Sequence, residues 1–169
     1  KRSNFERKPR DFYSTPFVAV EPLIEHLPKH FTFAEPCAGN GALVGHLEHF
    51  NGHCMWASDI EPQHKGISTQ DYKNVKENEL LESEYIITNP PWNRAILHPL
   101  IDHFAPQRPT WLLFDADWMH TKQSIPYIKR CSKIISVGRI KWFGNMTGKD
   151  NCAWYLFENK KMETKFYGR

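Results

Sequence analysis

The feature that most constrains the fold is a strand signal followed by a glycine turn and a helix signal. The apolar alternation of residues 31–34 predicts a strand, and Gly39 and Gly41 mark a tight turn after it. The helix signal is a set of apolar residues at the spacing of one helix face, namely Leu43, Val44, Leu47 and Phe50. A strand, a tight turn and a helix in this order form the first half of a βαβ unit, so the chain is predicted to be an α/β protein.

The turn after this strand has the chemistry of a ligand site. Gly39 and Gly41 allow a ligand to approach the backbone closely, and Glu35 at the strand end can accept hydrogen bonds from an ammonium group. A nicotinamide dinucleotide site would require the pattern Gly-x-Gly-x-x-Gly, but Val44 stands three residues after Gly41. The turn therefore favours a ligand other than a nicotinamide dinucleotide.

Two further acids follow later strand signals. Residues 53–57 predict a second strand, and Asp59 stands just after it, where a carboxylate can accept from the two hydroxyls of a ribose. Asp71 follows a short segment that can form a third strand, and it could accept from an adenine amine. Each acid alone is more typical of a turn residue or a helix cap, but their order along the chain favours a ligand site.

The most unusual turn is Asn89-Pro90-Pro91-Trp92, which follows a buried-strand signal at residues 85–88. The two prolines fix φ and remove two backbone donors, which makes the turn stiff and extended. The Asn89 side-chain oxygen and the Pro90 carbonyl can then accept from both N–H bonds of an amino group, while Trp92 stacks on the base that carries it. A purely structural turn after a core strand is the alternative.

This pair of acceptors suggests how an amine could be activated. Asn89 is a neutral amide, so it cannot act as a general base near neutral pH. Acceptors that hold both N–H bonds can instead pull the nitrogen toward a tetrahedral geometry and direct its lone pair. Stacking requires only a π face, so the change Trp92→Phe is expected to keep much of the activity.

The remaining elements continue the alternation of helices and strands. Thr15 and Pro16 can begin the first helix. Helices are predicted at about residues 16–27, 96–104 and 121–131, and strands at 111–114, 133–137 and 152–157. The last two strands are candidate antiparallel neighbours.

A loop between those two strands is both basic and aromatic. Its Arg139, Lys141, Trp142 and Lys149 suit contacts with phosphates and bases, although a long hairpin whose Trp142 covers the core is an equal alternative. Basic residues also crowd the start of the chain and form a predicted arm, and the net charge of +3 permits a polyanionic partner.

Composition and cysteine usage limit the remaining classes. The 169 residues, 40% of them hydrophobic, predict one domain over residues 1–169. The four cysteines form no Cys-x-x-Cys pair, so neither a zinc site nor a disulfide framework is indicated, and a reducing compartment such as the cytoplasm is expected. No apolar run reaches the ~20 residues that span a bilayer, so no membrane partner is predicted.

Three competing motifs carry less weight. Cys37 after Pro36 could be a cysteine nucleophile of the kind used on cytosine carbon, but it lies inside the glycine turn. A metal site on His46, His49 and His53 is disfavoured because Asn51-Gly52 interrupts the helix signal. An acid–base pair is a further alternative, formed by Asp115 and Asp117.

Three segments together resemble a known family. Residues 12–16, 35–41 and 89–92, in this order, are similar to the amino-methyltransferases that use S-adenosylmethionine, particularly small phage-type DNA adenine methylases. The Asn-Pro-Pro-aromatic turn is the most specific of the three motifs, and the resemblance extends from about residue 11 to 157. It implies a Rossmann-like fold, with a mostly parallel seven-stranded sheet, an antiparallel last strand and helices on both faces.

The resemblance also implies a cofactor and the residues that bind it. S-adenosylmethionine would bind with its ammonium on Glu35, its ribose on Asp59 and its adenine near Asp71 and Ile60. The implied cofactor contacts are Phe12, Tyr13, Thr15, Glu35, Pro36, Ala38, Gly39, Gly41, Asp59, Ile60 and Asp71. The implied catalytic residues are Asn89, Pro90, Pro91 and Trp92.

The function that the resemblance implies is methylation of the exocyclic amino group of adenine in DNA, with nucleic acid as the partner. Methylation of RNA adenine or of a protein glutamine amide, and a non-catalytic cofactor-binding role, stay open as alternatives. The chain departs from the family pattern in two respects. Its turn carries Trp92 rather than the more frequent Tyr or Phe, and no separate target-recognition domain is predicted within residues 1–169.

Overall fold

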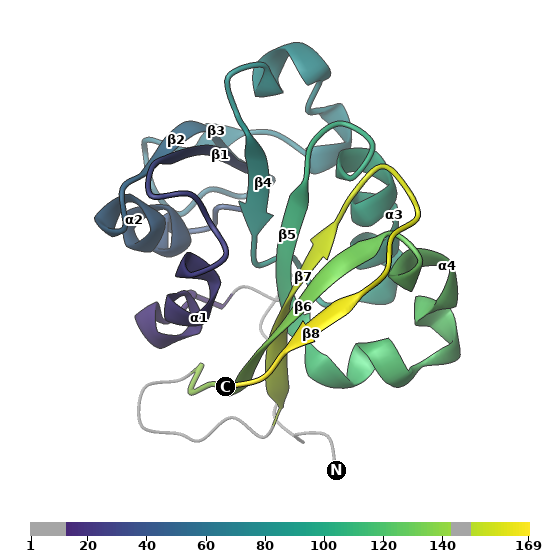
Figure 1. Cartoon of the computed structure of the whole chain (residues 1–169). Helices are drawn as coiled ribbons and strands as arrows, with labels where there is room; N and C mark the ends of the chain where they lie inside the picture. The colour runs from purple at the N-terminus through teal and green to yellow at the C-terminus, as the bar shows by residue number, and fades with distance from the viewer. Residues whose placement is uncertain (1–12, 143–149) are drawn as a thin grey trace.

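The computed structural model describes residues 13–142 and 150–169, and within them one eight-stranded sheet forms the centre of the molecule (Figure 1). Its spatial order is β3-β2-β1-β4-β5-β7-β6-β8. The strands are β1 (Phe31–Glu35), β2 (Gly52–Asp59), β3 (Ser68–Thr69), β4 (Tyr85–Thr88), β5 (Thr110–Asp115), β6 (Cys131–Arg139), β7 (Asn151–Phe157) and β8 (Lys165–Tyr167).

The sheet is parallel except for β7, which runs antiparallel to both of its neighbours, β5 and β6. This confirms the predicted mostly parallel α/β fold and the antiparallel pairing of the last two predicted strands. The sheet has one strand more than expected, because β8 adds to the edge of β6 with Phe166 opposite Ile134. Three residues are too few to show strand periodicity, so only the pairing with β6 identifies β8 as a strand.

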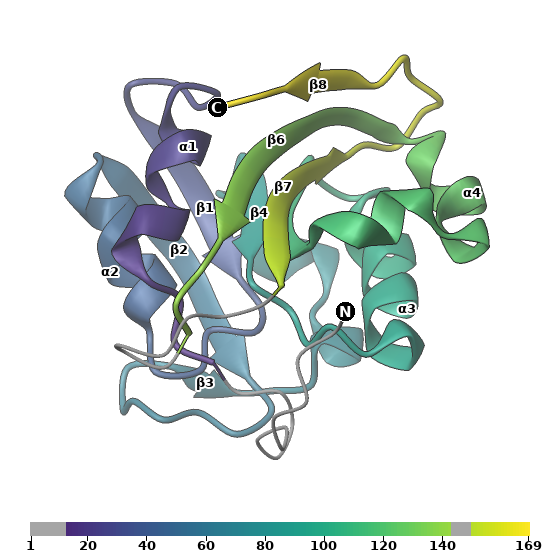
Figure 2. The ribbon, with the colours of Figure 1, turned by 90° about the horizontal axis from the view of Figure 1, so that it is seen from below.

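Helices cover both faces of the sheet (Figure 2). The α-helices are α1 (Glu21–Ile24), α2 (Ala42–His49), α3 (Arg94–Phe104) and α4 (Ile125–Ile128). Short 3₁₀ turns are η2 (Phe17–Ala19), η3 (Tyr72–Asn74), η4 (Glu77–Leu80), η5 (Ala116–His120) and η6 (Lys122–Ser124). Helices α1 and α2 lie on one face, and α3 and α4 lie on the other.

Two predicted helices are shorter than expected. The first is divided into η2 and α1, with Pro22 in the first turn of α1, because proline has no N–H to donate to a preceding turn. The predicted helix at 121–131 becomes η6 and α4, and Cys131 already begins β6. Helix α3 continues through Pro99, which distorts the pattern without ending the helix.

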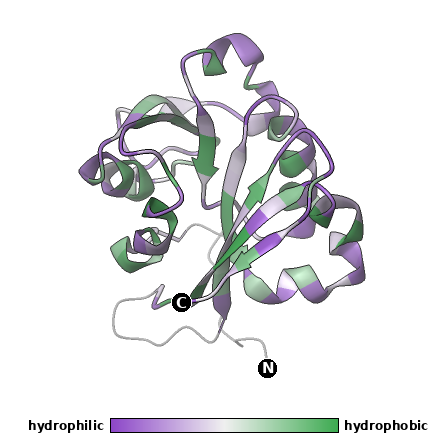
Figure 3. Cartoon of the chain, in the orientation of Figure 1, coloured by the Kyte–Doolittle hydropathy of each residue, from purple (hydrophilic) through white to green (hydrophobic). Residues whose placement is uncertain are grey.

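Each face of the sheet has its own hydrophobic core, and hydrophobic residues run along the central strands (Figure 3). On one face, Leu43 and Leu47 of α2 pack with Phe33 and Trp154 of the sheet. On the other, the buried face of α3, for example Phe104, packs with Phe114. Burial on both faces is what the near-continuous apolar strands require.

Strand order reverses between β1 and β4, since the chain proceeds from β1 to β2 and β3 on one side and returns to β4 on the other. In open α/β sheets, ligands bind beyond the carboxyl ends of the strands at such a reversal. Among the described residues, no helix has the length and apolar character needed to cross a bilayer.

Candidate functional site

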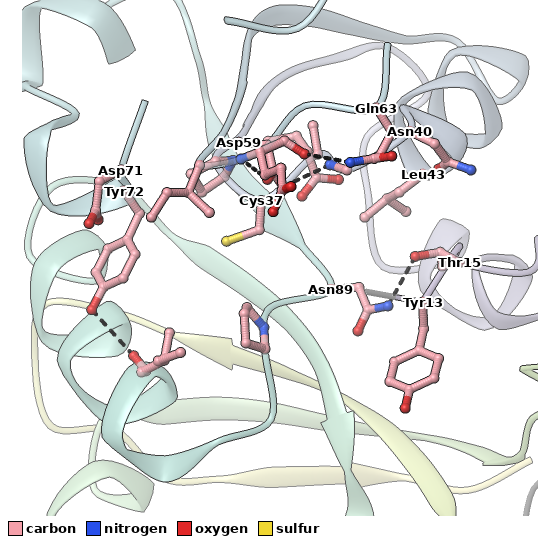
Figure 4. A pocket seen from close by; sticks show the side chains of 18 of the residues that line it. Tyr13, Thr15, Cys37, Asn40, Leu43, Asp59, Gln63, Asp71, Tyr72 and Asn89 are labelled. Atoms are coloured by element: carbon pink, nitrogen blue, oxygen red, sulfur yellow. Dashed lines mark hydrogen bonds between the residues drawn. The ribbon is translucent and has the colours of Figure 1, made fainter. Parts of the chain in front are cut away.

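A cavity of about 520 Å³ lies beyond the carboxyl ends of β1, β2 and β4, at the reversal in strand order (Figure 4). It brings together most of the residues that the sequence predicts for a cofactor site. These are Tyr13, Thr15, Glu35, Pro36, Ala38, Gly39, Asp59, Ile60 and Asp71. Phe12 lies outside the described residues, and Gly41 lies outside the cavity lining.

The turn after β1 depends on glycine because of its backbone angles. Gly39 has φ 53° and Gly41 has φ 80°, both in the left-handed region that disfavours a side chain. A Cβ on Gly41 would lie 3.6 Å from Ile67 Cδ1, which is an ordinary contact, so the dihedral angle and not the space requires glycine. Gly41 therefore shapes the turn into α2, and its predicted contact with a ligand stays a prediction.

Asp59 ties this turn to the end of β2. Its Oδ2 accepts a hydrogen bond from Gly39 N (2.9 Å), and its Oδ1 accepts one from Glu61 N (2.8 Å). A carboxylate oxygen has two acceptor positions, so each oxygen keeps one for a ligand hydroxyl. Asp59 thus has the turn role that its sequence position suggested, and its predicted role as a ligand for ribose hydroxyls stays a prediction.

Glu35 is a buried carboxyl group at the wall of the cavity. It is 1% exposed, and its Oε1 makes no hydrogen bond within the described part of the chain. Burial raises the pKa of Glu35 from 4.5 to about 8; the Thr88 hydroxyl opposes this shift and the Asp59 charge adds to it. A buried carboxyl oxygen without a partner is costly unless a ligand satisfies it, so Glu35 Oε1 fits a cationic or donor group in the cavity.

The far wall of the cavity is suited to a flat apolar ring. Ile60 is 54% exposed although it is a large hydrophobic residue, and both it and the buried Tyr72 line the cavity. Asp71 caps η3 by accepting from Lys73 N (3.0 Å), and its side chain also borders the cavity. An exposed apolar side chain beside a cavity is a common feature of ligand sites.

The turn after β4 lies on the opposite side of the same cavity, with Asn89 and Pro91 in its lining. Asn89 Nδ2 donates to Thr15 Oγ1 (3.2 Å), and Trp92 Nε1 donates to Asn89 Oδ1 (3.3 Å). Pro90 and Trp92 lie outside the lining. The Trp92 N–H, to which the sequence assigned no role, is therefore bound to the amide expected to act in catalysis.

The segment Tyr13-Ser14-Thr15 connects the two turns. Ser14 Oγ accepts from Asn40 Nδ2 of the glycine turn (3.1 Å), and the Thr15 carbonyl accepts from His46 Nε2 of α2 (3.0 Å). His46 therefore has a structural partner. No group of three or more His, Cys, Asp or Glu side chains that could hold a metal ion occurs within residues 13–142 and 150–169.

An aromatic cluster borders the turn after β4. The Trp142 ring lies 5.8 Å from the Trp92 ring at 84° and 6.1 Å from the Tyr13 ring. Arg139, at the end of β6, and Lys141 are exposed, whereas Lys149 lies outside the described residues. Trp142 thus packs on the core and on the predicted catalytic turn, as the alternative of a core-covering hairpin expected, and its predicted contact with nucleic acid stays a prediction.

Several lining residues were missed by the sequence analysis. They are Cys37, Asn40, Leu43, Glu61, Gln63, Tyr72, Lys73 and Ile96. The first seven lie within three positions of a predicted cofactor residue, so proximity in sequence could have indicated them. Ile96 could not be found that way, because it enters the cavity from α3 only through the packing of that helix.

The competing cysteine and acid motifs are disfavoured by their surroundings in the fold. Burial raises the pKa of the Cys37 thiol well above its usual value, and the nearby carboxylates of Glu35 and Asp59 add to the shift. A protonated thiol is a weak nucleophile, which disfavours the cysteine mechanism. Asp115 contacts Arg94 (3.5 Å) and caps η5, and neither it nor Asp117 lines the cavity.

The sequence matches no protein-family model and no curated protein, but solved structures share its fold. A Pyrococcus horikoshii protein assigned as an RNA methyltransferase matches with TM-score 0.65 and 14% identity, over 96% of this chain and 95% of its own. A Listeria monocytogenes protein assigned as a class I S-adenosylmethionine-dependent methyltransferase matches with TM-score 0.56 and 12% identity, over 90% and 61%.

The M protein of the type I restriction enzyme EcoKI matches with TM-score 0.53 and 10% identity, over 90% of this chain and 46% of its own. This chain therefore spans less than two thirds of the second and third of these neighbours. At these identities the likeness establishes the fold, which is the Rossmann-like fold of class I methyltransferases.

Proposed function

We propose that the chain binds S-adenosylmethionine in the cavity and transfers its methyl group to the exocyclic amino group of adenine in DNA. The observation that carries the proposal is the position of Asn89. It faces the same cavity as Glu35 and Asp59, so an amine held by Asn89 would lie beside a ligand held by the two acids. The methyltransferase fold and the resemblance of the Asn-Pro-Pro-Trp turn support this chemistry.

The cavity residues fit the cofactor group by group. The unpartnered Glu35 Oε1 suits the ammonium, the free acceptor positions of Asp59 suit the ribose hydroxyls, and Ile60 suits a face of the adenine. When bound, S-adenosylmethionine supplies an electrophilic methyl group on a sulfonium. The contribution of the chain is therefore to place an amine in line with that group.

Asn89 performs this placement as an acceptor. Its Oδ1 and the Pro90 carbonyl would each accept one N–H of the amine, which turns the nitrogen lone pair away from the turn and into the cavity. Neither group removes a proton before transfer. Once the nitrogen is cationic, its acidity is high enough for the extra proton to leave to solvent.

DNA is favoured as the substrate by the resemblance to phage-type adenine methylases and by the likeness to the EcoKI M protein. One observation keeps RNA as a second candidate. The Pyrococcus neighbour assigned as an RNA methyltransferase has the highest TM-score of the three and matches over nearly its whole length, as expected for a compact enzyme.

A methyl-transfer assay with tritiated cofactor tests the proposal. Duplex DNA, single-stranded DNA, RNA and a glutamine-containing protein are offered in parallel, and the labelled product is digested to identify the modified unit. The expected product is N6-methyladenine from DNA. Label in RNA adenine would establish the second candidate, and label in none of the substrates would contradict the proposed chemistry.

The change Asp59→Ala is expected to weaken cofactor binding by about 1–3 kcal/mol, because ribose hydroxyls lose their acceptor and Gly39 N loses its partner. Isothermal titration calorimetry with S-adenosylmethionine measures the effect. The matched control is Asp102→Ala, which removes an exposed carboxylate from α3. If Asp59→Ala and the wild type bound S-adenosylmethionine with equal affinity, Asp59 would not be a cofactor-binding residue.

Arg139 and Lys141 are expected to contact phosphates, because they are exposed and flank the aromatic cluster beside the turn after β4. Changing either to alanine should weaken DNA binding equally for all sequences and reduce the slope of log K against log salt by about one unit. The control is Lys29→Ala, because Lys29 is exposed and lies just before the amino end of β1, whereas Arg139 lies at the carboxyl end of β6. If both variants kept the wild-type salt slope, Arg139 and Lys141 would be ordinary solvated surface residues that do not contact phosphates.

A further inference from the structure

We propose that Thr15 and the indole of Trp92 clamp the Asn89 amide from both ends and so determine that the site accepts an amine. This inference rests on the proposed function and assigns positioning residues to the same site. Thr15 Oγ1 receives a hydrogen bond from Asn89 Nδ2 at 3.2 Å, and Asn89 Oδ1 receives one from Trp92 Nε1 at 3.3 Å. Both ends of the amide are thus held by side chains of the chain itself.

The donor and acceptor types fix the orientation of the amide. The indole N–H can only donate, so the Asn89 atom that it contacts must be the oxygen. A half-turn of the amide would place the Nδ2 hydrogens against the indole N–H and leave two donors facing each other. Trp92 excludes that state, and the Thr15 hydroxyl stabilises the opposite one.

The clamp also decides what the site can hold. The carbonyl oxygen of Asn89 has two acceptor positions, and Trp92 occupies one of them. The remaining position accepts an N–H donor, whereas a carbonyl oxygen of a substrate would meet another acceptor. In a turned amide, Nδ2 would instead attract a carbonyl group. Orientation of one amide therefore separates bases with an exocyclic amine from bases with a carbonyl at the same position.

Thr15 is placed rigidly enough for this role. It is 5% exposed, and its carbonyl accepts from His46 Nε2 at 3.0 Å. The preceding residue is tied to the glycine turn through the contact of Ser14 with Asn40. Thr15 and the preceding residue thus connect the turn after β4 to α2 and to the glycine turn of the proposed cofactor site.

Steady-state kinetics, measured with the substrate that accepts the methyl group, separate positioning from binding. Thr15→Val should lower kcat by about tenfold with KM changed by less than about twofold, because the substrate contacts remain but the amide can turn. Thr15→Ser restores the hydroxyl and should recover most of kcat. Trp92→Phe keeps a π face but should also lose about tenfold in kcat, in contrast to the mild effect expected from the sequence.

The double variant Thr15→Val with Trp92→Phe should lose less than the product of the two single losses, since both changes release the same amide. Two matched controls remove comparable hydrogen bonds elsewhere. Thr164→Val removes a bond to Cys131 O at the amino end of β6, and Trp118→Phe removes a bond to His98. Both should keep kcat, and thermal unfolding confirms that each variant folds.

A second measurement does not depend on activity. The NMR signal of the Trp92 indole N–H is identified by its loss in Trp92→Phe. This signal should be protected from hydrogen exchange, and its chemical shift should change in Asn89→Ala and in Thr15→Val. An exposed-like exchange rate with no shift in either variant would overturn the clamp, as would unchanged kcat in both Thr15→Val and Trp92→Phe. If the wild type transfers no methyl group to any substrate, the proposed function fails, and the NMR result still decides on the clamp.

Discussion

The change Asn89→Ala should reduce methyl transfer by roughly 10²–10³-fold while the affinity for S-adenosylmethionine stays nearly constant. The variant loses the side-chain acceptor, so an amine could be held only by the Pro90 carbonyl and its lone pair would no longer be directed. The proposed cofactor contacts are on Glu35 and Asp59, which come from β1 and β2 and are unchanged in this variant. Loss of kcat without loss of cofactor binding would identify an interaction that matters mainly in the transition state.

Single-turnover methyl transfer and calorimetric cofactor binding measure the two quantities on the same preparation. Asn159→Ala provides the control, because it removes an exposed asparagine amide just after β7, at the edge of the sheet opposite the cavity. Wild-type turnover in Asn89→Ala would show that the two-acceptor arrangement is not used, and the Pro-Pro turn would then be a structural feature of the end of β4.

Cofactor affinity should rise steeply with pH as the pH approaches about 8. In the unliganded protein, burial raises the pKa of Glu35 to about 8, so the carboxyl group is mostly protonated at neutral pH. An ammonium group favours the ionised form, so binding should release close to one proton at pH 7. Below the pKa, each pH unit should increase affinity by up to about tenfold.

Calorimetry at pH 7 in two buffers with different ionisation enthalpies counts the released protons. Two comparisons identify Glu35 as the source of the protons. The variant Glu35→Gln should bind S-adenosylmethionine weakly and without proton release. 5′-Methylthioadenosine, which lacks the ammonium, should bind the wild type without proton release. Affinity that does not vary between pH 6 and 8 would show that Glu35 is not the ammonium partner.

The same shift has a consequence for stability in the absence of ligand. A carboxyl group with a folded-state pKa near 8 and an ordinary value of 4.5 binds its proton more tightly in the folded state. Its contribution to stability is therefore complete below about pH 4.5 and is lost as the pH rises through about 8. Glu35→Gln should accordingly unfold at a higher temperature than wild type at pH 8.

The fold class could be predicted because its signals are local. A strand, a glycine turn with two positive φ angles and an amphipathic helix lie next to one another in the chain, and this order alone implies a βαβ unit. The strand that ends at Thr88, just before Asn89, was predicted with its observed bounds, since prolines cannot continue it. β8 was missed because three residues carry no periodic signal, and only pairing with β6 makes them a strand.

For the candidate site, the sequence determined which chemical groups are present and in which order the strands deliver them. Glu35, Asp59 and Asn89 each follow a strand signal, so parallel strands place them at one edge of the sheet. The tertiary structure decided how these groups are held and what their environment does to them. Burial shifts the pKa of Glu35, and Asn89 is held by Trp92 and, across 74 positions of sequence, by Thr15. These features depend on packing between distant elements, which no local pattern records.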